Sequence, residues 1–238
     1  MAENYGEIPE IGGIYGFTRG ISKWILEKFY NINFVGFENV PTNNEPLIIV
    51  SNHDTPNESW HFEKRRGEIV PHTHSVDHLL IGMFLRQKIH AVASTKHYDN
   101  RLRRCILNIL EQVPASPEGI GEAKEFLDKG DSIMIFPEGN SGQGTLLGKP
   151  VKYGWGLGSL VETYPTVRVL PTYVRIQGKK DGLLPKFDWA DVVFGEPFVY
   201  GEEFDSLPRE HLGKVDHEKI SEEIMRRKIM PLEERVSR

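Results

Sequence analysis

The run Leu47-Ile48-Ile49-Val50, followed directly by Ser51-Asn52-His53, decides the fold class of this chain. A short, unbroken apolar run with polar residues on both sides is typical of a parallel strand that is buried on both faces of a sheet. Ser132-Ile133-Met134-Ile135-Phe136 has the same character and leads into Pro137-Glu138-Gly139-Asn140. In open sheets of parallel strands, function is found beyond the carboxyl ends of the strands. We therefore expect functional residues directly after Val50.

Strand and helix patterns alternate along the rest of the chain. The polar stretch 54–70 is predicted to be a surface excursion that contains a short helix. Without an internal repeat or an obvious linker, this alternation predicts a single α/β domain with a mainly parallel sheet flanked by helices. Further strands are predicted at 31–37, 89–94, 167–176 and 191–194, and helices at 12–30, 77–87, 98–110, 119–129, 155–163 and 216–236.

Length, charge and cysteine content narrow the class of protein. The 238 residues suit one domain with a sizeable core, and a formal net charge of -5 argues against a general nucleic-acid-binding surface. The single cysteine, Cys105, excludes disulfide scaffolds and fits a reducing compartment; we expect it to be a small core residue. Neither a secretory signal nor an apolar run of membrane-spanning length is visible, so a cytoplasmic location is predicted.

Residues 71–78 concentrate three histidines and one carboxylate. A histidine becomes an effective general base when a carboxylate orients its ring and stabilises the imidazolium. His72 and Asp77 are five positions apart, which on an uninterrupted helix would turn them about 140° away from each other. They can meet only if His72 lies in the turn before a helix and Asp77 in its first turn. The apolar residues that follow Asp77 agree with a helix beginning there, and His72 and Asp77 are the candidate catalytic pair.

Several motifs together resemble the glycerolipid acyltransferase family, which includes bacterial lysophosphatidic acid acyltransferases and tafazzins. His72 and Asp77 match the family's His-xxxx-Asp motif, and Phe136-Pro137-Glu138-Gly139 matches its second signature. The similarity runs in order over most of residues 32–200 and includes 34–53, 169–174 and 193–197. It implies the family's α/β acyltransferase domain. It also implies transfer of an acyl chain from an acyl-CoA or acyl-carrier-protein thioester to a hydroxyl, with no further cofactor.

This resemblance also sets the expected domain limits. Residues 1–31 are predicted to form an N-terminal amphipathic helix, 32–205 the acyltransferase domain, and 206–238 a helical tail. In the family, the histidine that closes the first buried strand is usually the catalytic one. Here His53 is followed by Glu58 at the same offset, whereas His72 and Asp77 come nineteen residues later. We interpret residues 54–71 as an insertion that puts His72 in the catalytic place, with His53 lining the site.

The acceptor site departs from the family pattern. The family's middle motif and second signature carry arginines for an acceptor phosphate, but the corresponding segments here, 113–117 and 138–141, contain none. Each absent guanidinium removes charge-assisted bonds worth about 1.5–3 kcal/mol. The acceptor is therefore expected to be a lysophospholipid or a related lipid, and not a simple glycerol phosphate. The expected substrate-binding residues are His53, Glu138, Gly139, Asn140, Ser141, Lys149 and Lys152.

Two other classes of protein remain open. His72, His74, Asp77 and His78 have the ligand types of a zinc hydrolase, although their spacing is one residue longer than the metallo-β-lactamase pattern. A lipid-binding relative without catalysis is the other alternative.

The predicted helix at 12–30 bears on membrane attachment. It has Phe17 and Trp24 among its apolar residues and Arg19 and Lys23 on the other side. Such a helix either packs on its own domain or lies at a bilayer surface. Because a lipid acceptor must be met at the bilayer, we expect peripheral membrane association. The oligomeric state is left open.

Overall fold

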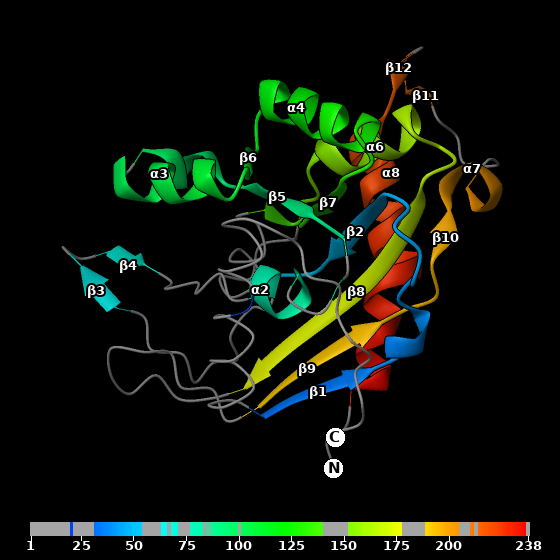
Figure 1. Ribbon diagram of the computed structural model, residues 1–238, viewed down its shortest axis with the longest axis horizontal. Coiled ribbons are helices and arrows are strands. Elements are labelled where there is room, and N and C mark those ends of the chain that lie inside the picture. The colour runs from blue at the N-terminus through cyan, green and yellow to red at the C-terminus, as the bar shows by residue number, and fades with distance from the viewer. Residues whose placement is uncertain are drawn as a thin grey trace.

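The computed structural model describes residues 20, 31–53, 63–65, 68–70, 77–82, 85, 87–99, 101–139, 152–177, 189–204, 210–211 and 214–236. Within these residues one eight-stranded sheet has the order β1-β9-β8-β2-β7-β5-β6, with β10 paired to β8 (Figure 1). Its strands are β1 (Asn31–Val35), β2 (Leu47–Ser51), β5 (Ile89–Ala93), β6 (Val113–Pro114), β7 (Ser132–Ile135), β8 (Arg168–Gln177), β9 (Trp189–Phe194) and β10 (Phe198–Val199).

The sheet is mainly parallel, as predicted. Strands β8, β2, β7, β5 and β6 run in one direction, whereas β9 is antiparallel to β8 and β1 is parallel to β9. The helices that connect or cover these strands are α2 (Asp77–Gly82), α3 (Arg101–Ile109), α4 (Pro117–Asp128), α6 (Trp155–Thr163), α7 (Tyr200–Glu203) and α8 (His217–Ile224). Short 3-10 turns are η1 (Phe37–Asn39), η2 (Thr95–Tyr98) and η5 (Met230–Arg235).

Strand β2 is fully buried because helices cover both faces of the sheet. Successive side chains of a strand point to opposite faces. Ile48 and Val50 accordingly belong to one apolar core with residues of α4, α6 and α8. Leu47 and Ile49 belong to a second core, together with Leu80 and other residues of α2. Figure 1 shows α2 in front of the sheet and α8 behind it.

The C-terminal segment is part of the first core. The single helix predicted at 216–236 is instead three pieces: α8, a π-helical turn η4 (Met225–Ile229), and η5. Pro231 has no backbone N–H and ends regular helical hydrogen bonding at the start of η5. Its neighbour Leu232 is buried in the same core as α6.

The short helix predicted within 54–70 falls on a stretch of which only 63–65 and 68–70 are described, and these residues form an antiparallel pair, β3 (Glu63–Arg65) with β4 (Glu68–Val70). One further prediction differs from the structure. Cys105 is exposed, so its prediction as a core residue was wrong. It lies on α3, which Figure 1 shows beyond the β5–β6 edge and away from the covered faces of the sheet. A second small pair, β11 (Glu210–His211) with β12 (Lys214–Val215), precedes α8. The helix predicted at 12–30 falls almost wholly outside the described residues.

Candidate functional site

The carboxyl ends of β2 and β7 bring two sequence motifs together. The strands are parallel neighbours, with Val50 opposite Ile135, so the residues that follow them meet at one edge of the sheet. The backbone N–H of His53 donates to Oε2 of Glu138 at 3.2 Å, and Glu138 is buried. The His53 ring stacks on Phe136, with centroids 4.4 Å apart and an angle of 14° between planes. Residues 85 positions apart in sequence therefore form one site at this carboxyl edge.

Asn52 fixes the chain directly before His53. Its side-chain amide donates from Nδ2 to the backbone oxygen of Val174 at 2.9 Å. The backbone N–H of Val174 donates to Oδ1 of Asn52 at 2.8 Å. The last β2–β8 register pair is Ser51 with Thr172, so the Asn52 amide, one residue beyond the end of β2, continues the ladder to Val174, two residues further along β8. Since Asn52 and Val174 are both buried, this pairing is protected from water.

The turn after β7 is built around Glu138 and Gly139. Gly139 donates its N–H to the Phe136 oxygen at 3.0 Å and has a φ of 51°, in the left-handed region that favours glycine. Gly154 donates its N–H to the Pro137 oxygen at 2.7 Å. This bond brings the segment that contains Tyr153 to the same turn.

Electrostatics support that arrangement. Burial raises the pKa of Tyr153, and the carboxylates of Glu138 and Glu222 raise it further. Lys152 is exposed beside Tyr153. The predicted residues Asn140, Ser141 and Lys149 lie outside the described part of the chain.

Asp77 is the first described residue of helix α2 (Asp77–Gly82), which lies within the helix predicted at 77–87. Helix α2 follows β2 and precedes β5 in the chain, and its Gly82 end lies near the start of β5, because a Cβ built at Gly82 would lie 3.9 Å from Cδ1 of Ile89. Leu85, the next described residue after Gly82, is not helical, so the helix ends short of the predicted Gln87. His72 lies outside the described residues.

Two features of the described residues concern metal binding and membrane insertion. In the part of the chain that the structure describes, no group of three or more His, Cys, Asp and Glu side chains is arranged to hold a metal ion. Most of the cluster at 72–78 is outside that part. Among the same described residues, no helix combines the length and apolar character needed to cross a membrane.

Comparison with protein-family models gives no match, and comparison with curated protein sequences gives none. The structure is similar to the solved structure of the 1-acyl-sn-glycerophosphate (LPA) acyltransferase PlsC from Thermotoga maritima, with a TM-score of 0.58. The match covers 94% of this chain and 82% of that chain, at 22% sequence identity. The chain therefore has the fold of this acyltransferase, and the predicted resemblance is confirmed at the level of the fold.

Two contributors to the site were missed in the sequence. Asn52 was visible only as part of a motif, and Tyr153 was not considered. A usable signal for Asn52 was its position directly after a fully buried strand, where an amide can replace the next pair of ladder bonds. Tyr153 gave no such signal, because its proximity to Glu138 depends on the Gly154–Pro137 backbone bond.

Proposed function

We propose that this protein is an acyltransferase that moves a fatty acyl chain from acyl-CoA or acyl carrier protein to a hydroxyl of a lysophospholipid or related lipid. The observation that carries the proposal is an acyltransferase fold in which the His53 and Glu138 segments meet at the carboxyl edge of the sheet. This edge is where parallel α/β sheets place their chemistry.

In the proposed mechanism, His72 removes the proton from the acceptor hydroxyl, and Asp77 orients and stabilises the resulting imidazolium. The acceptor oxygen attacks the thioester carbonyl carbon, the carbon–sulfur bond breaks, and the thiolate leaves with the proton returned by His72. No acyl-enzyme forms. Asp77 is in helix α2, as the proposed pairing with a histidine in the preceding turn requires, and this supports the assignment.

Glu138 and Gly139 form the floor of the proposed site. The Glu138 carboxylate accepts from the His53 backbone, so it positions that segment as well as any substrate. Gly139 gives the turn its left-handed bend, and a backbone N–H beyond it is the proposed donor to the developing oxyanion. Lys152, with Lys149 on the same sequence segment, supplies positive charge toward a polar headgroup.

We infer an acceptor whose binding does not depend on a phosphate–arginine pair. The segment 113–117 corresponds to the family's middle motif. It forms β6 and the first turn of α4, with Ser116 capping that helix through a 3.2 Å bond from Gly119. The segment has no charged side chain, and the next residue, Glu118, is acidic. A guanidinium would bind phosphate bidentately, and this segment has none.

The test is a transfer assay read by mass spectrometry. Purified protein, isotope-labelled acyl-CoA and a lipid extract are mixed, and the lipid that gains the labelled chain is identified. We expect a labelled lipid with wild type and none with His72→Ala. Asp77→Asn should keep at most a small fraction of the activity, because a carboxamide cannot stabilise an imidazolium.

His53→Ala is the matched control for the choice of histidine. It should retain most transfer if His53 only lines the site. Loss of transfer in His53→Ala with retention in His72→Ala would reverse the assignment. Transfer that depends on stoichiometric zinc would favour the metal-hydrolase class instead, and folded wild type without transfer to any lipid would favour a lipid-binding relative.

A further inference from the structure

Helix α3 (Arg101–Ile109) exposes charged and apolar side chains on one side. Residues four apart on a helix lie on the same side of it. Arg101, Cys105 and Ile109 therefore form one row along α3, and all three are exposed. Ile109 is 50% exposed, more than any other large hydrophobic residue in the part of the chain that the structure describes. Leu107, on the opposite side of the helix, is half-buried. The row is thus an outward face that combines a cation with apolar groups.

Positive charge is concentrated around this face. The segment 95–109, which contains η2 and α3, has four basic residues and one acidic residue, a net charge of +3, whereas the whole chain has a net charge of -5. Lys96 and Arg101 are exposed, and within the described residues neither pairs with a carboxylate. Arg104 is also exposed and donates from Nε to the backbone oxygen of Tyr98 at 2.6 Å, which joins α3 to η2. An acidic protein therefore has a locally basic surface at α3.

Helix α3 is connected at both ends to the edge of the sheet that carries the candidate site. It follows β5, in which Ala91 lies opposite Met134 of β7, the strand that leads to Glu138. It precedes β6, in which the first residue, Val113, lies opposite Val92 of β5. The chain thus leaves the carboxyl end of β5 and re-enters the sheet at the same level, and Figure 1 shows α3 beyond β5 and β6.

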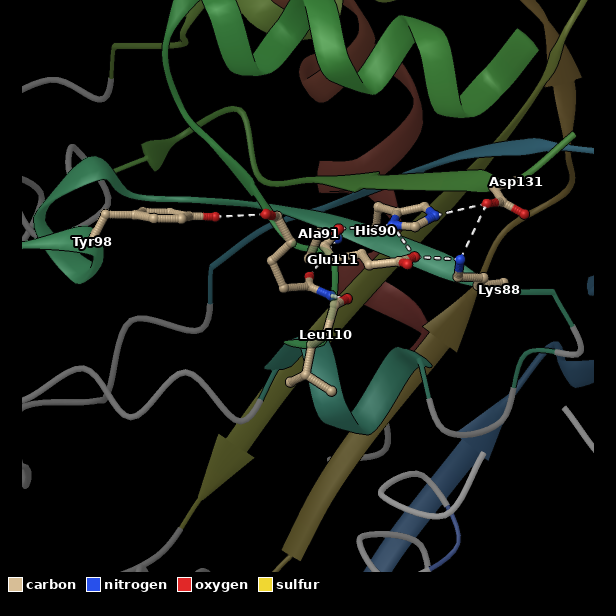
Figure 2. A network of polar contacts seen from close by, with 8 residues as sticks. Lys88, His90, Ala91, Tyr98, Leu110, Glu111 and Asp131 are labelled. Carbon is tan, nitrogen blue, oxygen red and sulfur yellow. Dashed lines mark hydrogen bonds and ion pairs between the residues drawn. The ribbon is translucent and has the colours of Figure 1, made fainter. Parts of the chain in front are cut away.

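Hydrogen bonds fasten the two connections of α3. The Tyr98 hydroxyl in η2, before the helix, donates to the backbone oxygen of Gln112, after the helix, at 2.7 Å (Figure 2). The Gln112 side chain accepts in turn from the Ala91 N–H in β5. The exposed face of α3 is therefore preformed, and a partner that docks on it has little chain to order.

A second exposed apolar residue lies at the same edge. The Gly154 N–H donates to the Pro137 oxygen directly after β7, and Trp155 is the next residue in the chain. Trp155 is 36% exposed, and nearby Lys152 is exposed as well. Tryptophan and lysine are typical of the boundary between the hydrocarbon and the headgroups of a bilayer. The carboxyl edge thus presents apolar and basic side chains in two places.

We propose that the exposed face of α3 docks on an anionic bilayer, where Cys105 and Ile109 insert among the headgroups and the nearby basic side chains bind lipid phosphates. Exposed apolar residues beside basic ones are the pattern of helices that lie at a bilayer surface. The charge of such a surface acts over only about 10 Å at physiological salt, so the basic segment is attracted although the whole chain is acidic. The choice of a bilayer rests on the proposed function, since a lipid acceptor has to enter at this edge.

Cys105 provides a reporter for docking, because it is the only cysteine of the chain and is exposed. An environment-sensitive fluorophore attached to Cys105 should shift its emission to the blue when vesicles of phosphatidylglycerol and phosphatidylcholine are added. The control moves the label to an exposed position near the other end of α4, in a protein with Cys105→Ser and Glu125→Cys. That end of α4 leads to Ser132, which lies opposite Ile89 at the start of β5, so the moved label should not respond.

Lys96→Gln combined with Arg101→Gln tests the charge. Each basic residue near an anionic surface strengthens binding about fivefold, so this variant should bind the anionic vesicles about thirtyfold more weakly than wild type. Its binding to vesicles of phosphatidylcholine alone should be unchanged, because that binding depends on apolar contacts. Lys124→Gln combined with Lys129→Gln is the matched control, since it removes the same charge near the far end of α4. It should bind both kinds of vesicle as wild type does, and circular dichroism checks the fold of every variant.

Three results would overturn the docking of α3. The first is an unchanged emission of the Cys105 label with vesicles that the protein binds, or no binding to any vesicle. The second is an equal affinity of the Lys96 and Arg101 variant and wild type for anionic vesicles, or an equal loss in the control variant. The third is a blue shift with an acidic carrier protein and not with vesicles, which would assign α3 to a protein partner. Acyl transfer is measured separately: docking without transfer contradicts the proposed function alone, and transfer without docking contradicts only the docking of α3.

Discussion

Replacing Asn52 with alanine tests the anchor beneath the site. The substitution removes both amide bonds to Val174 and leaves a buried N–H and a buried carbonyl without their partner. An unsatisfied buried polar group costs about 1–3 kcal/mol. With two such groups, the free energy of unfolding should fall by about 2–6 kcal/mol, an appreciable share of the stability of a domain of this size.

Urea denaturation followed by circular dichroism measures this loss, provided that the slope against urea concentration stays unchanged. Asn39→Ala is the matched control. It removes an amide that donates once, at 3.0 Å, to the Phe194 oxygen in a half-buried place. Its expected cost is only about 0.5–1.5 kcal/mol. Equal costs for Asn52→Ala and Asn39→Ala would refute the argument that the two-bond amide anchors the end of β2.

Three other predictions follow from packing, titration and sequence. A Cβ at Gly158 would lie 2.2 Å from the His217 backbone oxygen, so Gly158→Ala should cost about 1–3 kcal/mol in urea unfolding. Gly121→Ala, with nothing within 4 Å, should instead stabilise slightly. Burial, with the charge of Glu122, raises the pKa of Tyr98 to about 12. The neutral phenol is the form that stabilises the fold, so between about pH 10 and 12 wild type should lose stability more steeply than Tyr98→Phe, measured by urea midpoints. Wild type should co-sediment with liposomes, and a variant in which Phe17 and Trp24 are both replaced by Asp should stay in the supernatant although its circular dichroism spectrum is unchanged. A wild-type protein that stays in the supernatant with every lipid composition contradicts the membrane prediction.

The strands and most helices were predictable because their signals are local. The apolar runs in β2 and β7 allow few alternatives, and the helix at Trp155–Thr163 was predicted with the same limits. The β3–β4 pair was not, since polar residues at 63–70 show no alternation that distinguishes a short hairpin from a surface helix. Exposure of Cys105 could not be predicted either, because it depends on where α3 lies relative to the sheet and not on its own pattern.

The site was predictable as a set of segments but not as a set of contacts. That His53 and Glu138 share an edge follows from two parallel strands, and the sequence indicated both strands. The hydrogen bond from the His53 backbone to the Glu138 carboxylate could not be foreseen. The motif match suggests that Glu138 contacts substrate, whereas in the structure its carboxylate is bonded to another part of the protein. The contacts of His90 with Glu111 and Asp131 were missed for a related reason: the three residues lie in β5 and in two separate turns (Figure 2).

The contacts of His53 sharpen the choice between the two candidate histidines. Glu138 is bonded to the backbone N–H of His53, which alanine retains, so His53→Ala removes the ring and its stacking on Phe136 but leaves the strand end in place. Stability and chemistry are therefore separable at this position. If His72 is the base, His53→Ala should change the Michaelis constant for the acceptor more than the turnover number, whereas His72→Ala should abolish turnover with urea stability unchanged. A His53→Ala protein that is folded, binds acceptor normally and has no turnover would assign the base to His53.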